Sequence, residues 1–295
     1  MVKIRDTRSF DFRRPRFRPI PVRMLVPNVI TLLAICAGLT AIRLSTEDRL
    51  ELAVGAIVFA AILDGIDGRV ARLIKGQSKF GAELDSLADF VNFGVAPAVI
   101  LYFWQLNQLH NVGWIAAMVF AISGALRLAR FNATMDDPDK PAFAANFFTG
   151  VPAPAGAILA LLPLYFSFLG IGVLPAPLAA LYVLGIAFLM VSRLPVFSGK
   201  KIGKRVSPEL VLPVVVLAVL FIASLISYPW QVMSVGSLVY LASLPFGWMS
   251  YARLAREAAQ GETATASSAP APDAAGVPAP PPPADSADQR PPRLN

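Results

Sequence analysis

Four aspartates stand close together in an otherwise apolar part of the sequence. They are Asp64, Asp67, Asp85 and Asp89, in the stretch DGIDGRVARLIKGQSKFGAELDSLAD. The runs on either side, VGAIVFAAIL and FVNFGVAPAVILYFW, have the composition of membrane spans. A carboxylate at membrane depth costs a few kcal/mol or more. Four of them in one short interval predict a common partner that offsets this cost.

Helical spacing places these aspartates on two surfaces that can face each other. An α-helix turns through roughly 100° per residue. The residues that share one stripe of the first helix are Asp64, Asp67, Gly68 and Ala71. Asp85 and Asp89 are four residues apart and share a face of the next helix, following Gly81 by one turn. The polar turn KGQSK allows the two helices to run antiparallel with their acidic faces together.

Facing carboxylates repel one another unless cations lie between them. The stretch offers oxygen ligands without His or Cys, which favours a hard cation such as Mg²⁺, Mn²⁺ or Ca²⁺. Basic residues surround the same site: Arg69, Arg72, Lys75 and Lys79. Small residues allow either a close helix approach or room for a flat ligand: Gly68, Ala71 and Gly81. Metal, arginine and a small-residue cleft together indicate a diphosphate held for displacement.

The order of these residues resembles the signature of the CDP-alcohol phosphotransferases. The matching positions are Asp64, Asp67, Gly68, Ala71, Arg72, Gly81, Asp85 and Asp89. The segments FGAELDSLADFVNFGVAPA, RLARFN, FFTGVPAPAGA and VSRLPVFSGKK are similar to the membrane-bound phosphatidylserine synthases of that family. The resemblance covers roughly residues 24–250, and Asn92 departs from it at a position where Ser is expected.

The resemblance implies transfer of a phosphatidyl group from CDP-diacylglycerol to the hydroxyl of L-serine, with release of CMP. It implies that Asp64, Asp67 and Asp85 bind Mg²⁺ or Mn²⁺, with two ions expected. Asp89 is the expected general base and a candidate ligand of the second ion. The expected CDP-diacylglycerol contacts are Gly68, Ala71, Arg72 and Gly81. The resemblance also implies a homodimer.

Three further basic residues are candidate ligands for the acceptor or a phosphate: Arg127, Arg130 and Lys200. A guanidinium group suits both carboxylates and phosphates. The alternative explanation is topogenic charge for the two arginines and a solvated or lipid-bound charge run for Lys200. Within the same chemistry the acceptor alternatives are glycerol phosphate, inositol phosphate and choline. From another class, a cation transporter would also carry intramembrane carboxylates. The middles of these spans show no continuing polar path, which argues against transport.

Composition excludes an ordinary soluble domain. The chain has 295 residues, of which 56% are hydrophobic and 15% are charged. Apolar residues come in long runs, so we expect an all-α, polytopic integral membrane protein. The net charge of +7 comes from basic residues between spans and is explained by membrane orientation without nucleic acid. Neither Cys36, inside a span, nor His110, in a short loop, is expected to take part in catalysis.

Eight spans are expected, six forming the family's core and the last two extending it. The first begins at Pro27 and Asn28, and the others cover about residues 51–74, 80–104, 112–130, 150–169, 174–197, 208–226 and 230–250. The segment Phe148–Pro154 (FTGVPAP) either lines a cavity as non-helical backbone or simply starts the fifth span.

Charge distribution predicts the orientation in the membrane. With a cytoplasmic N-terminus, only Arg43 and Arg49 among the 26 basic residues face outward. The aspartates then lie at the cytoplasmic ends of the second and third spans, in the inner membrane. Residues 1–23 form a basic segment that either binds anionic lipid or only sets topology. Residues 251–295 are a cytoplasmic tail that becomes rich in Pro and Ala and is expected to be disordered.

Overall fold

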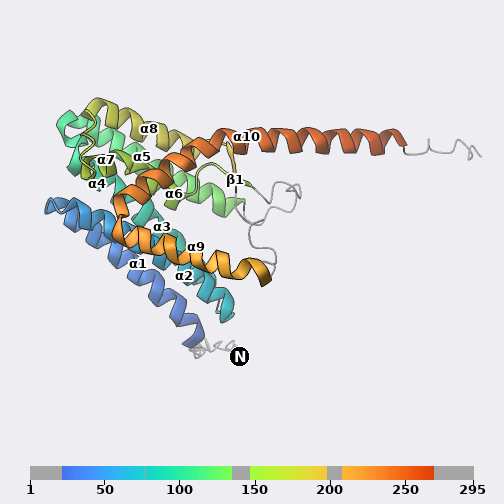
Figure 1. The fold of residues 1–295 in the computed structure, drawn as a ribbon, viewed down its shortest axis with the longest axis horizontal. Helices are drawn as coiled ribbons and strands as arrows, with labels where there is room; N and C mark the ends of the chain where they lie inside the picture. The colour runs from blue at the N-terminus through green and yellow to red at the C-terminus, as the bar shows by residue number, and fades with distance from the viewer. Residues whose placement is uncertain (1–21, 77, 135–146, 198–207, 269–295) are drawn as a thin grey trace, which may run out of the picture. The chain divides into compact units, whose positions relative to one another are not determined.

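The computed structural model describes residues 22–76, 78–134, 147–197 and 208–268 (Figure 1). Two predictions concern residues outside these ranges and stay predictions: the basic segment 1–23, of which only the last two residues are described, and the candidate ligand Lys200. The tail predicted to be disordered over residues 251–295 lies outside the ranges only after residue 268, because residues 251–268 form the end of the last helix. The described part divides into a unit that ends at Tyr251 and a second unit that begins at Ala252. All the contacts described below belong to the first unit.

Helices make up nearly all of the described chain. In the first half these are α1 (Val22–Thr46), α2 (Leu50–Leu73), α3 (Lys79–Asp89), the π-helix η1 (Phe90–Val95), α4 (Ala96–Trp104), the 3₁₀-helix η2 (Leu106–Leu109) and α5 (Asn111–Ala133). In the second half they are α6 (Ala153–Ala160), α7 (Leu162–Phe168), α8 (Ala176–Val191), α9 (Pro208–Ser227) and α10 (Pro229–Ser268). Two short strands, β1 (Phe147–Thr149) and β2 (Pro195–Phe197), complete the order.

The helices confirm an all-α polytopic membrane protein. Within the described ranges, four helical segments are long and apolar enough to cross a membrane: Leu25–Thr46, Lys79–Trp104, Asn111–Ala133 and Pro229–Arg253. Two shorter apolar helices cover Ala176–Val191 and Val211–Ser227. Helix α2 has 24 residues but carries the charges of the aspartate motif at its C-terminal end. Each of the eight predicted spans corresponds to one helix or to two or three consecutive helices.

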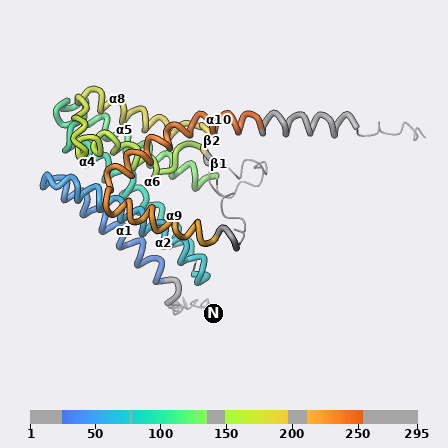
Figure 2. Tube along the Cα trace, in the orientation of Figure 1, coloured from blue at the N-terminus to red at the C-terminus, as the bar shows by residue number. Residues whose placement is uncertain are grey.

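The N-terminal helices build the scaffold of the motif. The Cα trace shows α1 and α2 side by side and antiparallel (Figure 2). Small residues with no exposed surface, such as Ala41 on α1 and Ala53 on α2, are part of the buried core. Helices α3, η1 and α4 follow without a break and form the third span. At Gly124 of α5 a Cβ would lie 3.3 Å from the Cα of Gly94, so glycine permits close packing of α5 against η1.

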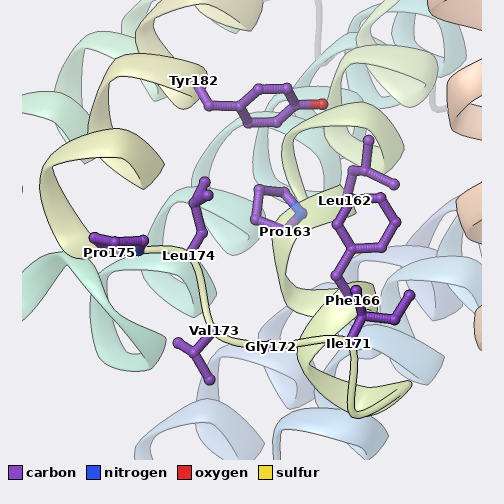
Figure 3. A pocket seen from close by; sticks show the side chains of 9 residues that line it. All are labelled: Leu162, Pro163, Phe166, Ile171, Gly172, Val173, Leu174, Pro175 and Tyr182. Carbon is purple, nitrogen blue, oxygen red and sulfur yellow. The ribbon is translucent and has the colours of Figure 1, made fainter.

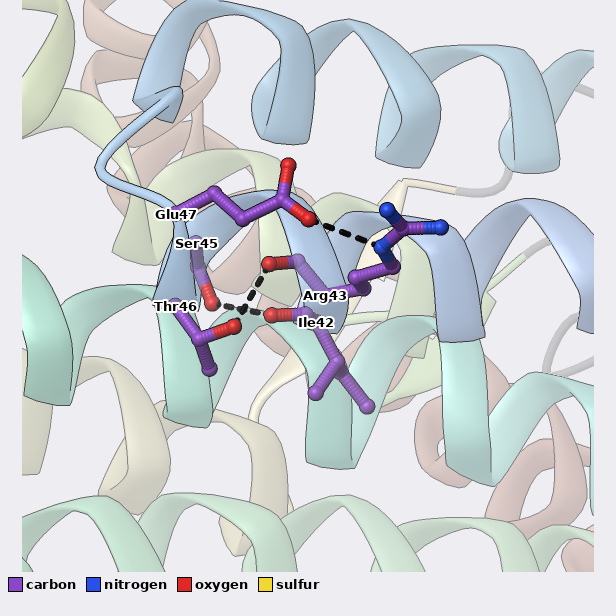
Figure 4. A network of polar contacts seen from close by, with 5 residues as sticks. All are labelled: Ile42, Arg43, Ser45, Thr46 and Glu47. Carbon is purple, nitrogen blue, oxygen red and sulfur yellow. Dashed lines mark hydrogen bonds and ion pairs between the residues drawn. The ribbon is translucent and has the colours of Figure 1, made fainter.

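The turn between α1 and α2, which precedes the aspartates of α2 by about four helical turns, carries a network of polar contacts at the end of α1 (Figure 4). Ser45 Oγ donates to the Ile42 carbonyl at 2.7 Å, and Thr46 Oγ1 donates to the Arg43 carbonyl at 2.7 Å, so side chains satisfy carbonyls of the last turn of α1. Arg43 Nε also contacts Glu47 Oε1 at 2.8 Å. An exposed pair of this kind contributes about 1 kcal/mol or less.

The predicted fifth span is divided into two helices, α6 and α7, by Pro163. Proline has no N–H, so it cannot bond the carbonyl four residues earlier, and its ring clashes with that carbonyl. Tyr182 of α8 donates its hydroxyl to the freed Leu159 carbonyl at 2.8 Å, and Tyr165 donates to the Ile158 carbonyl at 3.1 Å. The hydroxyls of these two tyrosines therefore donate to carbonyls that the break between α6 and α7 leaves without backbone donors.

The strand before α6, β1, pairs antiparallel with β2, the strand after α8. Its register pairs Phe147 with Phe197, Phe148 with Val196 and Thr149 with Pro195. Gly150 follows β1 with φ of 75°, and its N–H donates to the Leu194 carbonyl at 2.8 Å. A Cβ at this position would lie 2.6 Å from the Met190 carbonyl, so glycine is required both by the backbone angle and by the space. The stretch FTGVPAP thus starts as a strand, and α6 begins only at Ala153.

Candidate active site

The two motif helices bring the aspartates together as their spacing predicts. Asp64 and Asp67 lie in the C-terminal half of α2, and Asp85 and Asp89 lie on α3. Helix α3 starts where it does because the Ser78 hydroxyl caps it, accepting from the Gly81 N–H at 3.0 Å.

Three carboxylates form a cluster that could hold a metal ion. One oxygen from each of Asp64, Asp67 and Asp85 lies within 4.8 Å of the other two. Asp89 lies beside this cluster, close enough to Asp64 for the two carboxyl groups to interact directly. The four aspartates of the motif are therefore one constellation, with three arranged around a common point and the fourth at its edge.

None of these carboxylates forms an ion pair in the described part of the chain, although the guanidinium of Arg127 lies near Asp89. The ion pair found there, Arg43 with Glu47, lies at the far end of α1. Asp67 is 3% exposed, yet its Oδ1 has no hydrogen-bond partner among the described residues, and the same is true of Asp89 Oδ1. Buried carboxylate oxygens without partners are strongly unfavourable unless a cation binds them. The donor set therefore fits a hard divalent cation such as Mg²⁺ or Mn²⁺.

Helix α1 contributes a residue that the motif does not contain. Thr31 Oγ1 donates to Asp67 Oδ2 at 2.7 Å, and a longer contact of 3.1 Å joins it to the Pro27 carbonyl of its own helix. Because one hydroxyl has one proton, the shorter contact identifies Asp67 as the acceptor. The bond orients the carboxylate and leaves its Oδ1 free toward the cluster. A polar residue inside an apolar span, three positions after Asn28, was the sequence signal for this role.

Replacing Thr31 with Val is expected to weaken metal binding about tenfold or more. Hydrogen bonds that orient a metal-binding carboxylate typically contribute about 10- to 100-fold to metal affinity. Valine keeps the shape of the side chain and removes the donor. The measurement is the Mn²⁺ concentration for half-maximal activity, with a direct Mn²⁺ titration beside it. Thr40→Val is the matched control, since Thr40 bonds only the Cys36 carbonyl of α1. Equal metal affinity in both variants would contradict the role.

The glycines of the motif have different surroundings. A Cβ at Gly68 would meet no atom within 4 Å, so the space beside it is open. A Cβ at Gly81 would lie 2.9 Å from Asn28 Oδ1, so Gly81 serves the close packing of α3 on α1. The two uses that the sequence left open for small residues are therefore divided between them: Gly68 leaves room, and Gly81 allows helix contact.

Comparison with known proteins agrees with this geometry. The sequence model of the family described as CDP-alcohol phosphatidyltransferase matches residues 24–249, which is most of the chain. The chain belongs to the CDP-alcohol phosphatidyltransferase family. It is therefore an enzyme of a metal-dependent family, and the cation transporter considered as an alternative is not supported.

Several proteins similar to this chain share one name. A CDP-diacylglycerol–serine O-phosphatidyltransferase of Mycobacterium leprae is 42% identical over 236 residues, covering 79% of this chain and 77% of the relative. The protein of that name from Mycobacterium tuberculosis is 40% identical over 246 residues, covering 82% and 85%. The one from Bacillus subtilis is 34% identical over 170 residues, covering 57% and 88%.

The basic residues predicted to bind an acceptor have different positions in this CDP-alcohol phosphatidyltransferase. Arg127 lies near Asp89, and its guanidinium stacks over the Phe131 ring at 5.6 Å. Arg130 instead donates to the Val191 carbonyl at the C-terminal end of α8, where a cation suits the helix dipole. Of the two arginines proposed as acceptor ligands, Arg127 is thus the one near the aspartates, whereas Arg130 joins α5 to α8.

The surroundings of two polar residues on α5 and η1 were not apparent from the motif. Asn132, at the end of α5, donates to Ser86 Oγ at 2.9 Å and so ties α5 to the helix of Asp85. Asn92, the position that departs from the family pattern, is 1% exposed in η1. A Cβ on Gly38 would lie 2.1 Å from Asn92 Oδ1, so the glycine on α1 makes room for this longer side chain.

A separate apolar pocket lies away from the aspartates, where α7 connects to α8 (Figure 3). Its volume is about 330 Å³, and its lining residues are Leu162, Pro163, Phe166, Ile171, Gly172, Val173, Leu174, Pro175 and Tyr182. The one side-chain hydroxyl in the lining, that of Tyr182, is already bonded to the Leu159 carbonyl. The pocket contains no charged group that could bind a diphosphate, so it is not the reaction site.

Proposed function

We propose that this protein transfers the phosphatidyl group of CDP-diacylglycerol to the hydroxyl of L-serine, forming phosphatidylserine and CMP. The observation that carries the proposal is the clustering of Asp64, Asp67 and Asp85 within 4.8 Å, with Asp89 beside them. The shared name of the relatives supports serine as the acceptor. In the reaction a serine oxygen forms a bond to the lipid-bearing phosphorus, and the bond from that phosphorus to CMP breaks.

Asp64, Asp67 and Asp85 are proposed to bind Mg²⁺ or Mn²⁺, and Asp89 to share a second ion. When bound, such cations neutralise the diphosphate and stabilise the charge that develops on the CMP leaving group. Thr31 keeps Asp67 oriented for this task through its 2.7 Å bond.

Asp89 is proposed to act as the general base. Its Oδ1 has no partner among the described residues, so it is free to accept the proton of the serine hydroxyl during attack on phosphorus. The position of Asp89 at the edge of the cluster allows the acceptor to approach without displacing the three carboxylates around the common point.

The nucleotide is proposed to lie over the C-terminal part of α2. Gly68 leaves open space there, and Ala71 is the next small residue along the same stripe. Arg72 is exposed one residue further on, so its guanidinium is available for a phosphate. Gly81 takes part through helix packing, which holds α3 against α1.

We further propose that residues 24–250 form the membrane domain with the site facing the cytoplasm in the inner membrane. The segments 1–23 and 251–295 are cytoplasmic extensions of this domain. In support, the family match covers residues 24–249, and Arg43 and Arg49 lie at the end of the helices opposite the aspartates. Contact with anionic lipid through the basic segment and assembly as a homodimer are part of the same proposal.

The test is an assay of the purified full-length protein with CDP-diacylglycerol, Mn²⁺ or Mg²⁺, and serine. CMP and phosphatidylserine should appear together, depend on serine, and disappear when a chelator is added. Parallel reactions contain glycerol phosphate, inositol phosphate or choline in place of serine. CMP release driven only by one of these would keep the chemistry and reject serine. No CMP with any acceptor from folded protein would reject the proposed reaction.

Replacing Gly68 with Ala is expected to reduce kcat/KM for CDP-diacylglycerol about tenfold or more while leaving the fold intact. The added methyl meets no protein atom, and alanine favours a helix over glycine by about 0.5–1 kcal/mol, so stability should be unchanged or higher. The measurements are steady-state kinetics and thermal unfolding. Gly55→Ala on the same helix, also in open space, is the control. Unchanged kinetics in Gly68→Ala would remove the nucleotide from this position.

A further inference from the structure

Helix α10 directs one face toward the rest of the first unit. Trp230, near its start, stacks on Tyr165 with ring centroids 6.2 Å apart and packs on Phe168 at 4.7 Å. Ser234, Ser237 and Tyr240 follow at intervals of three to four residues, which keeps them on the same face. Both serines are buried, with exposures of 3% and 2%. This face of the last predicted span is therefore an inner surface.

The hydroxyl groups on this face lack hydrogen-bond partners among the described residues. Ser234 Oγ, Ser237 Oγ and Tyr240 Oη are all buried atoms of this kind. Several serine hydroxyls elsewhere in the helices bond a carbonyl of their own helix, as Ser123 does to the Val119 carbonyl at 2.7 Å. Buried hydroxyls without partners are rare in folded proteins, and each calls for an explanation such as a ligand or a bound water.

Tyr240 connects this face to the proposed active site. Its hydroxyl lies within electrostatic range of Arg127 of α5, with no hydrogen bond between the two groups, and Arg127 in turn lies within electrostatic range of Asp89. No ion pair holds the Arg127 guanidinium within the described ranges, where its partner is the ring of Phe131. A hydroxyl without a hydrogen-bond partner therefore lies near a guanidinium that is itself near the proposed base, and the two groups together could bind one anion.

We propose that Tyr240 and Arg127 together bind the carboxylate of the amino-acid acceptor, which makes α10 a specificity determinant of the enzyme. This inference rests on the proposed function. The hydroxyl and the carboxylate of serine are on neighbouring carbons, so the groups that hold them must be neighbours too. Asp89 accepts the proton of the serine hydroxyl. The guanidinium of Arg127 attracts the serine carboxylate and repels the serine ammonium group. Tyr240 donates a second hydrogen bond, as carboxylates prefer.

The experiment uses the full-length protein with the substitution Tyr240→Phe, which removes only the hydroxyl. The KM for serine should rise roughly 10- to 100-fold, the range for one hydrogen bond to a charged group. The kcat should stay within about threefold and the KM for CDP-diacylglycerol should not change, because the bond to the carboxylate is the same before and during reaction. Tyr228→Phe is the matched control, since Tyr228 is an exposed tyrosine between α9 and α10.

A second acceptor separates recognition from general damage. Ethanolamine has the hydroxyl and ammonium of serine but no carboxylate, so Tyr240→Phe and wild type should use it equally well. Equal losses with serine and ethanolamine would overturn the inference and indicate a structural role. A rise in the KM for CDP-diacylglycerol instead of serine would overturn it too, and would assign Tyr240 to the lipid phosphate.

Binding without turnover gives an independent readout. Serine, but not ethanolamine, should raise the thermal unfolding temperature of the wild type, and Tyr240→Phe should lose most of that rise. Absence of the rise in the wild type would overturn the inference. If wild type releases CMP with serine and Tyr240→Phe has the same serine KM, the inference fails and the proposed function stands. If wild type releases no CMP with serine, the proposed function fails first.

Discussion

Replacing Asp85 with Ala is expected to lower serine-dependent CMP release by about a thousandfold or more. Of the three clustered aspartates, Asp85 is the one supplied by α3, so its loss leaves ligands from α2 alone. A metal ion contributes several kcal/mol of charge stabilisation in the transition state, and each 1.36 kcal/mol is a factor of ten in rate. Removing one shared ligand should therefore remove most of the catalysis.

The same substitution should have the opposite effect on the stability of the metal-free protein. Without a cation the clustered carboxylates repel one another, so removing one of them relieves repulsion. Thermal unfolding in the presence of chelator should then occur at a higher temperature for Asp85→Ala than for wild type. Added Mn²⁺ should stabilise the wild type more than the variant, because a ligand stabilises the folded state according to its affinity.

These effects are measured by CMP release, Mn²⁺ titration and thermal unfolding with and without chelator. Glu83→Ala is the matched control, since Glu83 is an exposed carboxylate two residues earlier on the same helix. The control should retain wild-type activity and metal response. A variant at Asp85 that binds Mn²⁺ like the wild type and is equally active would show that the cluster is not the metal site.

Replacing Asp89 with Asn is expected to lower kcat by about 10²- to 10⁴-fold, the usual contribution of a general base. The amide has the shape of the carboxylate but does not take up a proton at neutral pH. Because Asp64, Asp67 and Asp85 are unchanged, at least one Mn²⁺ should still bind at their cluster. The expected result is thus a slow enzyme that keeps metal, in contrast to Asp85→Ala.

The measurement compares kcat with the number of Mn²⁺ ions bound. Asp48→Asn is the control, because Asp48 lies in the exposed turn after α1 with φ of 59°, an angle that Asn tolerates. Near-normal turnover of Asp89→Asn with metal bound would remove the assignment of the base. Loss of all Mn²⁺ together with activity would make Asp89 primarily a metal ligand.

Much of the site could be predicted from the sequence because its geometry is local. The spacing of Asp64 and Asp67 on one helix, and of Asp85 and Asp89 on the next, follows from helical periodicity and a short connecting turn. The long apolar runs likewise predict helical spans, since lipid leaves the backbone few other ways to satisfy its hydrogen bonds. Pro163, by contrast, was visible in the sequence, and its division of the fifth span was not predicted.

The residues that complete the site depend on which helices face each other. Thr31 reaches Asp67 across 36 positions of the sequence, and Tyr240 approaches Arg127 from the last predicted span. The difference between open space at Gly68 and packing at Gly81 also appears only when α1 lies against α3. The sequence by itself thus determined the membrane helices, the four aspartates and their pairing, because these depend on nearby residues. Only the tertiary structure decided which side chains from distant helices surround them, because helix packing is set by contacts between segments far apart in the chain.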